Sequence, residues 1–334
     1  MQIQQNISLK GYNTFGIDAK AKLFASFGSA EELEELVSAH SPILILGGGS
    51  NILFTKDFNG LVLKNEIRGI EKVKDDAGFV YVKAGAGENW HQFVLHCIQQ
   101  NQAGIENLSL IPGNVGATPI QNIGAYGVEV KEVFHELEAF HIKDKTIVRF
   151  NAADCQFGYR ESVFKRKYKD EFVILNVTYR LSRKPDFNIS YGAIEQELEK
   201  MEIKQLSIKS ISQAVINIRS SKLPDPKIYG NAGSFFKNPE VPYLKFEQLK
   251  KNFPGIVGYP LPDGKVKLAA GWLIEYCGWK GFRKGDAGCH GRQALVLVNY
   301  GNASGADIFE LSEMISHSIE RKFGVQLERE VNIL

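Results

Sequence analysis

The segment GNAGSFFKNP, residues 230–239, places one hydroxyl, that of Ser234, between small residues and two phenylalanines. It differs from the Gly-x-Ser-x-Gly turn that exposes the nucleophile of many hydrolases. No Asp or His lies close to Ser234 in the sequence to serve as a base. We therefore do not expect a hydrolase-type nucleophile here, and the segment raises the question of what an isolated hydroxyl does in an apolar turn.

Two glycine clusters, LGGGSN (46–51) and AGAG (84–87), each follow an apolar run that reads as a strand. Glycines adopt positive φ and let successive N–H groups approach a phosphate. LGGGSN matches neither the dinucleotide fingerprint nor the Walker loop. The spacing leaves two interpretations open, a pair of tight turns or a shared phosphate site.

The stretch 104–130 is rich in glycine and proline but not polar enough for a linker. Its backbone and short polar side chains suit a planar ligand that forms hydrogen bonds. An Ω-loop packed on itself is the alternative. The polar side chains are those of Asn114, Thr118, Gln121 and Asn122.

Arg160 stands beside an aromatic residue in FGYRESVFK, and its guanidinium suits a carboxylate or charge on a conjugated ring. A surface pair with Glu161 is the simpler alternative. For Glu330, near the C-terminus, a solvated carboxylate is the default. Cys289 precedes His290 directly, but adjacent side chains rarely point the same way, which disfavours a catalytic dyad.

Apolar periodicity predicts helices and strands in mixed order along the chain. The predicted helices are 29–40, 89–102, 194–201, 210–222, 270–279 and 305–324. The predicted strands are the apolar part of 42–51, then 60–65, 78–87, 133–142, 146–150, 172–182 and 294–299. The order lacks the regular alternation of a doubly wound sheet, so we expect an α+β protein with more than one domain.

Composition narrows the class of protein. The 334 residues are 44% apolar and 23% charged, as is usual for a globular protein. The net charge of +2 indicates neither a nucleic-acid nor a membrane partner. Four scattered cysteines without a CxxC pair predict no zinc site and fit a reducing compartment. The N-terminus lacks the pattern of a signal peptide, and no run approaches the ~18 apolar residues of a spanning helix. We expect a cytoplasmic protein.

Seven segments in this order resemble one family of flavoenzymes, the UDP-N-acetylenolpyruvoylglucosamine reductases, over nearly the whole chain. They are NTFGI, LGGGSN, AGAGENW, IPGNVGATPIQNIGAYG, FGYRESVFK, GNAGSFFKNP and AGWLIE. The resemblance implies an α+β fold in which a two-subdomain FAD-binding module of the vanillyl-alcohol oxidase type precedes an α+β substrate-binding domain. The implied divisions are 1–70 and 71–215 for FAD, 216–325 for substrate, and 326–334 returning to the FAD module with Glu330.

The resemblance also implies which residues bind FAD and substrate. The loop 111–127 would line the isoalloxazine, and Tyr191, in ISYGAI, would close over the nucleotide as in the first of the family's two types. The implied FAD contacts are Gly47, Gly48, Gly49, Ser50, Asn51, Ile111, Pro112, Gly113, Gly116, Ala117, Gln121, Asn122, Gly124 and Ala125. The implied substrate contacts are Tyr191, Lys222, Asn238, Tyr259, Lys280 and Gln293.

The implied reaction reduces the enolpyruvyl ether of UDP-N-acetylglucosamine to UDP-N-acetylmuramate for peptidoglycan precursor synthesis. NADPH would reduce FAD, flavin N5 would give hydride to C3, and Ser234 would protonate C2. Arg160 and a protonated Glu330 would oppose the charge that develops next to the substrate carboxylate. The chain departs from many relatives at Arg329, where they have proline.

Two alternative functions agree less well with the sequence. A different FAD-dependent oxidoreductase of the same fold would have no reason for GSFFKNP together with Tyr191. A nucleotide-binding protein without activity would have lost at least one of Arg160, Ser234 and Glu330, and all three are present. We therefore expect a monomeric reductase that acts on a small molecule, binds FAD and needs no metal.

Overall fold

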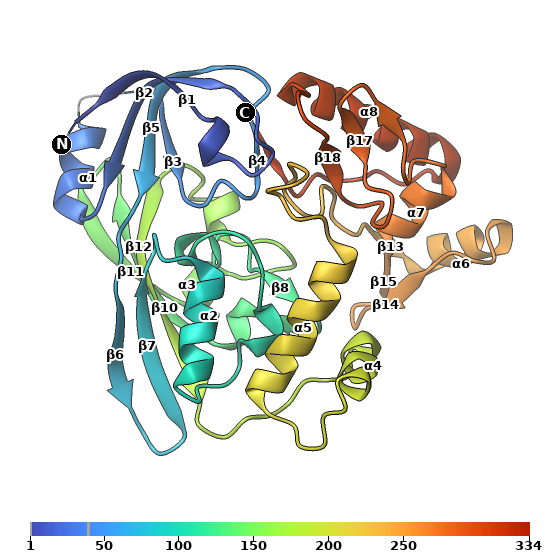
Figure 1. Cartoon of the computed structure of the whole chain (residues 1–334), viewed down its shortest axis with the longest axis horizontal. Helices are drawn as coiled ribbons and strands as arrows, with labels where there is room; N and C mark the ends of the chain where they lie inside the picture. The colour runs from blue at the N-terminus through green and yellow to red at the C-terminus, as the bar shows by residue number, and fades with distance from the viewer. Residues whose placement is uncertain (1, 39–40) are drawn as a thin grey trace. The chain divides into compact units, whose positions relative to one another are not determined.

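A computed structural model describes residues 2–38 and 41–334 (Figure 1). Its chain forms two compact units. The first comprises Met1–Ile7, Ala21–Gly48 and Asn59–Ser221, and the second Ser8–Lys20, Gly49–Phe58 and Lys222–Leu334. The stretches 8–20 and 49–58 thus group with the C-terminal part of the chain, although they were expected in the first FAD subdomain. The four-part division by ligand stays a prediction.

The first unit contains a four-stranded sheet in the order β1-β2-β5-β3. Its strands are Gln4–Ser8, Lys20–Phe27, Phe58–Asn65 and Ile43–Leu46 respectively. Strands β3 and β5 are parallel, as expected for apolar runs that are buried. Helix α1, Ala30–Val37, begins where the Ser29 side chain accepts a hydrogen bond from the Glu32 N–H. The predicted end of this helix at 39–40 lies outside the described residues.

The larger sheet of this unit has the order β11-β10-β12-β7-β6, and every pairing is antiparallel. Figure 1 shows β6 and β7 as a long hairpin at one edge of it. The strands are Thr146–Asn151, Phe134–His141, Phe172–Ser182, Phe79–Gly85 and Ile70–Asp75. The predicted strand 172–182 matches β12 in full.

A separate apolar core lies on each face of this sheet. Successive residues Ala139 and Phe140 of β10 join different cores, because consecutive side chains of a strand point to opposite faces. On the first face, helix α2, Trp90–Gln99, packs its indole and Phe93 against the ring of Tyr179. On the second face, α1 and the smaller sheet complete the core. The unit is therefore layered, with the larger sheet in the middle.

Two further helices complete the first unit. Helices α4, Gly192–Lys200, and α5, Ile208–Lys222, share a small core around Ile194 and Val215. Shorter elements connect the main ones: helix α3 (Ala152–Cys155), strands β8 (Gly124–Ala125) and β9 (Val128–Glu129), and 3-10 turns at Glu106–Leu108, Val115–Ala117, Val130–Glu132 and Val163–Lys165.

The second unit combines small sheets with three helices. Its sheets have the orders β13-β15-β14, β16-β17-β18 and β19-β4. The strands are Glu240–Pro242, Lys265–Leu268, Gly258–Pro260, Arg283–Lys284, Ala287–Cys289, Leu297–Asn299, Asn332–Ile333 and Ile52–Leu53 in that order. The helices are α6 (Tyr243–Asn252), α7 (Ala270–Tyr276) and α8 (Gly305–Phe323), and a 3-10 turn covers Lys10–Tyr12.

Helix α8 is the main support of the second unit and follows the predicted segment 305–324. The Ser304 side chain and Asp307 form a capping box at its start, and Gly324 ends it at φ +60°. Ile308, Leu311 and Ile315 lie on its buried face. In Figure 1 it runs beside β17 and β18.

The α+β class is confirmed, but several elements were not predicted, including strands β2 and β6 and helix α6. Strand β2 was overlooked in the N-terminal segment, and strand β6, IEKVKD, is almost wholly exposed at a sheet edge. Helix α6 buries only Leu249, so its apolar face is too weak to stand out. These elements depend on pairing and packing with neighbours more than on a periodic sequence.

Glu138 links four strands of the larger sheet. Its carboxylate accepts hydrogen bonds from Asn176 at 2.7 Å, Lys83 at 3.0 Å and Arg149 at 3.0 Å. The Asn176 amide, with Lys83 and Arg149, lowers the pKa of Glu138 to about 2. A depressed pKa in the folded state stabilises the protein above the unfolded value of 4.5, and this stabilisation is lost as pH falls toward 2.

We expect Glu138→Gln to lower the free energy of unfolding by about 1–3 kcal/mol at neutral pH, because Lys83, Arg149 and Asn176 lose the negative charge and one of the two acceptor oxygens. The difference from wild type should shrink as pH falls below 4.5. Urea unfolding at several pH values measures it. Glu71→Gln, an exposed change of the same charge on β6, is the control and should have little effect. A difference that does not vary with pH would contradict the ionic origin.

Candidate active site

The glycine loop 46–51 begins in the first unit, where it contacts the 111–127 loop, the other segment predicted to bind FAD. A Cβ on Gly48 would lie 2.8 Å from Gly113 Cα and 3.0 Å from Asn114 Oδ1. No side chain fits between these backbones. The structure therefore brings together two loops that sequence analysis assigned separately to the cofactor.

The loop continues in the second unit with Gly49 at φ +63°. A Cβ there would lie 1.9 Å from the Tyr12 carbonyl oxygen. The Thr14 N–H donates to the Gly49 carbonyl at 3.0 Å. Asn13 holds this support in place through hydrogen bonds with Leu9 and Ile17. The NTFGI segment thus shapes the turn, a role that sequence analysis did not assign to it.

The second glycine cluster also joins the 111–127 loop. The Val115 N–H donates to Glu88, and the Gly116 N–H donates to Ala86, at 2.8 and 2.9 Å. The Asn114 side chain donates to the Gly87 carbonyl at 3.1 Å. Both glycine clusters of the first unit therefore adjoin one loop, which agrees with a shared site better than with independent turns.

Most short polar side chains of the 111–127 loop bond within the protein. Thr118 contacts the Tyr179 hydroxyl at 2.7 Å, and Asn122 donates to Glu129 and to the Gly158 carbonyl. Thr118 and Asn122 are almost fully buried. The loop is thus packed on surrounding segments, whereas the Ω-loop alternative supposed packing on itself. Backbone groups, more than these side chains, are left to contact a ligand.

Arg160 is held by the same loop. Its guanidinium donates to the carbonyl oxygens of Gly124 at 2.5 Å and Asn122 at 3.4 Å. Its backbone adopts φ +53°, which is uncommon for a residue with a Cβ and is found at functional sites. Arg160 therefore lies at the predicted isoalloxazine loop, although the two are more than 30 residues apart in sequence.

Arg219 is a second cation of this region, and sequence analysis missed it. Its Nε donates to the Leu110 carbonyl at 3.2 Å, while the Leu110 N–H donates to His91 Nδ1 at 3.0 Å. Burial lowers the pKa of the Arg219 guanidinium, and the charge on Arg160 lowers it further against the opposing effect of Tyr126. No carboxylate in the described part of the chain pairs with Arg219. The positive charges of Arg219 and Arg160 in one region favour an anionic or electron-rich ligand.

Ser234 lies in a tight turn of the second unit. Gly233 has φ +71°, and its N–H donates to the Asn231 side chain at 3.0 Å. Phe235 and Phe236 are 0% and 1% exposed, and the ring of Phe15 packs edge-on against Phe235. The Ser234 Oγ has no hydrogen-bond partner among residues 2–38 and 41–334. The turn thus fixes a hydroxyl that remains available to a ligand.

The Ser234 segment pairs with the segment that carries Glu330. The Lys237 N–H donates to the Glu328 carbonyl, and the Glu330 N–H donates to the Phe235 carbonyl, both at 2.9 Å. The Asn51 side chain donates to the Glu330 carbonyl at 3.2 Å. Three predicted site segments of the second unit are therefore adjacent.

Lys237 has its own partner in this region. Its ammonium is 2.5 Å from a Glu328 carboxylate oxygen, and its side chain is 7% exposed. Its backbone N–H also belongs to the pairing. We therefore assign Lys237 to the support of the two paired segments.

The predicted substrate residues have varied surroundings. Asn238 Oδ1 accepts a hydrogen bond from the Ala270 N–H at the start of α7, and Lys280 pairs with Glu275 at 2.8 Å. Gln293 Oε1 accepts weakly from the Leu295 N–H at 3.4 Å. Tyr259, on β14, is 54% exposed, and Lys222 is exposed at the end of α5. Their assignment to substrate stays a prediction.

Tyr191 stands at the start of α4 and packs edge-on against Tyr126, with ring centroids 5.3 Å apart. Its loop is also bonded to the turn of Tyr126 and Gly127, because the Asn188 amide donates to the Gly127 carbonyl. The Asn107 amide donates in turn to the Asn188 carbonyl. The tyrosine loop thus contacts the end of the predicted isoalloxazine loop.

The Cys289–His290 dyad does not form. The Cys289 thiol donates to the Ala294 carbonyl at 3.0 Å, and burial raises its pKa to about 12. His290 Nδ1 is buried without a hydrogen-bond partner in the described residues. In the described part of the chain no cluster of His, Cys, Asp and Glu could hold a metal ion.

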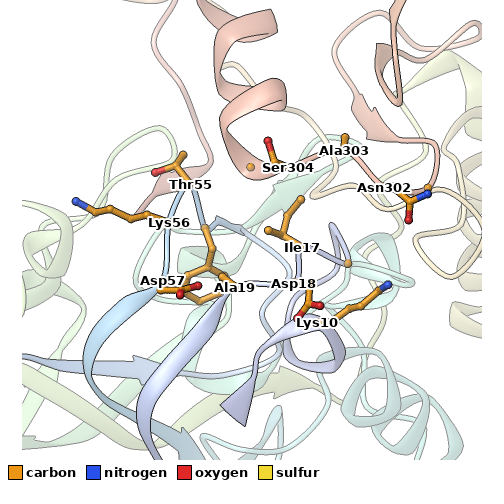
Figure 2. Close-up of a pocket in the computed structure, with 14 residues that line it drawn as sticks. Lys10, Ile17, Asp18, Ala19, Thr55, Lys56, Asp57, Asn302, Ala303 and Ser304 are labelled. Carbon is orange, nitrogen blue, oxygen red and sulfur yellow. The ribbon is translucent and has the colours of Figure 1, made fainter. Parts of the chain in front are cut away.

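A cavity of about 320 Å³ lies elsewhere in the second unit. Figure 2 shows Lys10 and Lys56 at opposite sides of it, with Asp18 and Asp57 between them. Asp18 accepts from Ser8, and Asp57 from the Lys20 N–H. None of the predicted site residues lines this cavity.

Comparison with known proteins identifies the family. Residues 225–334 match the C-terminal domain of UDP-N-acetylenolpyruvoylglucosamine reductase, and residues 21–151 match an FAD-binding domain. The reductase of Flavobacterium johnsoniae is 51% identical over 100% of both chains, and that of Pseudomonas aeruginosa is 49% identical over 100% of this chain and 99% of its own. The chain belongs to the UDP-N-acetylenolpyruvoylglucosamine reductase family. The expected family, its FAD-dependent oxidoreductase class and its small-molecule substrate are confirmed.

Solved structures agree at the level of fold. The reductase of Thermus caldophilus aligns with a TM-score of 0.71 at 23% identity, over 100% of this chain and 99% of its own. The 6-hydroxy-D-nicotine oxidase of Arthrobacter nicotinovorans aligns with a TM-score of 0.50 at 12% identity, over 97% of this chain and 86% of its own. The fold is thus shared with this oxidase. None of the described helices is long and apolar enough to cross a membrane.

The loops of this reductase-family chain fit FAD. Neighbouring main chain leaves no room for a side chain at Gly48 or Gly49, so bare backbone remains there, which suits contact with a pyrophosphate. The 111–127 loop offers backbone groups, and Arg160 adds fixed positive charge beside it. These features suit a phosphate-bearing cofactor with a planar polar ring.

We expect Gly49→Ala to prevent retention of FAD, because its Cβ would clash with the Tyr12 carbonyl and positive φ would strain an alanine by about 1–3 kcal/mol. The ratio of flavin to protein absorbance after purification measures the loss. Gly11→Ala is the control, since a Cβ there meets nothing within 4 Å. Normal FAD content in a folded Gly49→Ala protein would contradict the assignment of this turn.

Thiol reactivity tests whether Cys289 is an activated nucleophile. Burial raises the pKa values of Cys155 and Cys289 to about 12, so almost no thiolate forms at about pH 8. We expect iodoacetamide to modify the half-buried Cys277 and to spare Cys289 in the native protein, as read by peptide mass spectrometry. Rapid alkylation of Cys289 would instead indicate an activated thiol.

Proposed function

We propose that this chain reduces UDP-N-acetylglucosamine enolpyruvate to UDP-N-acetylmuramate, with Arg160, Ser234 and Glu330 as its catalytic residues. The observation that carries the proposal is the Ser234 turn. It holds a hydroxyl that has no hydrogen-bond partner among the described residues, on a segment paired with the Glu330 segment. A bound FAD, reduced by NADPH, supplies the hydride that is added at C3 of the enolpyruvyl group.

The residues of this chain have separate tasks in that reaction. Addition at C3 leaves negative charge at C2, next to the substrate carboxylate. This charge can delocalise into the carboxylate only by forming a dianionic enolate. Arg160 opposes this charge with a cation that is already oriented by the carbonyls of Asn122 and Gly124. A protonated Glu330 donates a hydrogen bond to the carboxylate, which a closed and partly dehydrated site favours.

Ser234 donates the proton to C2. A serine hydroxyl is a weak acid in water, but the enolate carbon is a strong base, so a hydroxyl fixed at the right place suffices. The buried rings of Phe235 and Phe236 limit access of water to the turn. No base is needed, because the hydroxyl gives up its proton instead of attacking. This accounts for a serine without an adjacent Asp or His.

The remaining assignments follow the family resemblance. Tyr191 closes over the nucleotide part of the substrate, and its present contact with Tyr126 places that loop beside the 111–127 loop. The other contacts assigned to the substrate are Lys222, Asn238, Tyr259, Lys280 and Gln293. We propose NADPH as the hydride donor, a monomer as the active form, and the cytoplasm as its compartment.

The proton-donor role is tested by Ser234→Ala in anaerobic stopped-flow absorbance. We expect NADPH to reduce the flavin of this variant at the wild-type rate. Flavin reoxidation on addition of UDP-N-acetylglucosamine enolpyruvate should slow by about 10²- to 10⁴-fold, because the proton at C2 has lost its source. Ser38→Ala, an exposed hydroxyl beyond α1, is the control and should match wild type in both steps.

Each outcome is decisive for a different part of the proposal. Reoxidation of Ser234→Ala at nearly the wild-type rate would make Ser234 a turn residue only. Failure of the wild-type flavin to reoxidise with this substrate, while other flavin substrates are turned over, would favour a different FAD-dependent oxidoreductase.

A further inference from the structure

The segment that carries Glu330 is short and has no regular secondary structure of its own. It pairs with the Ser234 segment through an isolated bridge between Phe236 and Arg329, and the Lys237–Glu328 ion pair also links the two segments. Its flanking hydrogen bonds, Lys237 to Glu328 and Glu330 to Phe235, are main-chain bonds and do not orient a side chain. The direction of the Glu330 side chain therefore also depends on how the neighbouring side chains of its segment are held.

Arg329 supplies such contacts to one face of α8. Its Nε donates to Ser312 Oγ at 3.0 Å, and its Nη2 donates to a Glu313 carboxylate oxygen. Its guanidinium carbon lies 4.8 Å from the centroid of the Phe309 ring. Phe309, Ser312 and Glu313 have the spacing of neighbours on one helix face, so a single guanidinium spans three of them.

The hydrogen bonds of Ser312 are consistent with this arrangement. Its hydroxyl is fully buried and donates to the Phe309 carbonyl at 2.7 Å, which leaves a lone pair to accept from Arg329. The Arg329 side chain is 26% exposed and that of Glu313 39%. An isolated surface pair contributes little, but a guanidinium with a buried hydroxyl, a carboxylate and a ring is held in one geometry.

Beyond Glu330 the chain is fixed as well. Strand β19 pairs with β4, and the Leu334 carbonyl accepts hydrogen bonds from the N–H and hydroxyl of Thr55 at 2.7 and 2.6 Å. Glu330 thus lies between an anchor on α8 and an anchor on β4. Since consecutive side chains of an extended segment point to opposite faces, binding of Arg329 to α8 directs Glu330 to the other face.

We propose that Arg329 is a positioning residue for Glu330 and acts through its contacts with Ser312 and Glu313 on α8. The inference rests on the proposed role of Glu330 in the step that consumes the enolpyruvyl substrate. It assigns to this chain's Arg329 a task that is separate from charge stabilisation at the reacting carbon. Loss of the anchor should therefore affect only the step in which Glu330 takes part.

The test compares Arg329→Met with two matched variants. Methionine keeps an apolar stem near Phe309 but removes both hydrogen bonds. Arg329→Lys retains a cation that can pair with Glu313. Arg321→Met removes the same charge from an exposed position of α8 and serves as the control. Thermal unfolding of each variant with FAD bound reports on overall stability.

We expect Arg329→Met to slow flavin reoxidation by UDP-N-acetylglucosamine enolpyruvate about 10- to 100-fold. Displacement of a reacting group by about 1 Å slows a step to a similar extent. Flavin reduction by NADPH should stay within about twofold of wild type, since Glu330 has no part in it. Arg329→Lys should recover part of the lost rate, and Arg321→Met should match wild type. The pH profile of reoxidation should also shift in Arg329→Met, because the surroundings of Glu330 change.

Other results would overturn the inference. Unchanged reoxidation in Arg329→Met, with Glu330→Gln slow in the same assay, would reduce Arg329 to a surface ion pair. Equal slowing of both half-reactions, or an unchanged pH profile with a lowered melting temperature, would mean general destabilisation. If Ser234→Ala and Glu330→Gln both reoxidise like wild type, the proposed function fails, and that failure is distinct from failure of the Arg329 anchor.

Discussion

The second unit depends on one pairing, in which the main chain of 235–237 bonds to that of 328–330. These segments are about 90 residues apart, and neither belongs to a long strand. The pairing brings Ser234 and Glu330 onto neighbouring chain segments and buries Phe235 and Phe236 beside them. Without it, the Ser234 hydroxyl and the Glu330 carboxylate would have no fixed relation within this unit. Helix α8 and strand β4 support the pairing from two directions.

In the first unit the main constraint is that an irregular loop must be held rigidly while some of its backbone groups stay accessible to a cofactor. The 111–127 loop has almost no regular structure, so its N–H and C=O groups need other partners. Ala86, Gly87 and Glu88 supply them from the main chain, while Thr118 and Asn122 use their side chains for the same purpose. A loop held at so many points is rigid without being a helix or strand. Its close approach to Gly48 explains why that position is a glycine.

Carbonyl oxygens help to orient two guanidinium groups of the first unit. Arg160 donates to Gly124 and Asn122, and Arg219 donates to Leu110. A carbonyl dipole fixes the direction of a guanidinium without neutralising its charge. Two cations oriented in this way are consistent with a reaction that develops negative charge on its substrate.

The sequence by itself determined the family, the α+β class and most long elements, because strand 172–182 and helix 305–324 have strong periodicity and clear ends. It also indicated Arg160, Ser234 and the glycine turns, since these lie in contiguous motifs. The sequence did not reveal strand β6, helix α6 or Arg219, whose roles depend on neighbours distant in the chain. Only the tertiary structure decided that Asn13 supports the Gly49 turn, that Cys289 bonds to a carbonyl, and that Arg329 is anchored to α8. Local periodicity encodes which face of an element is buried, whereas a hydrogen-bond partner is chosen by the folded chain.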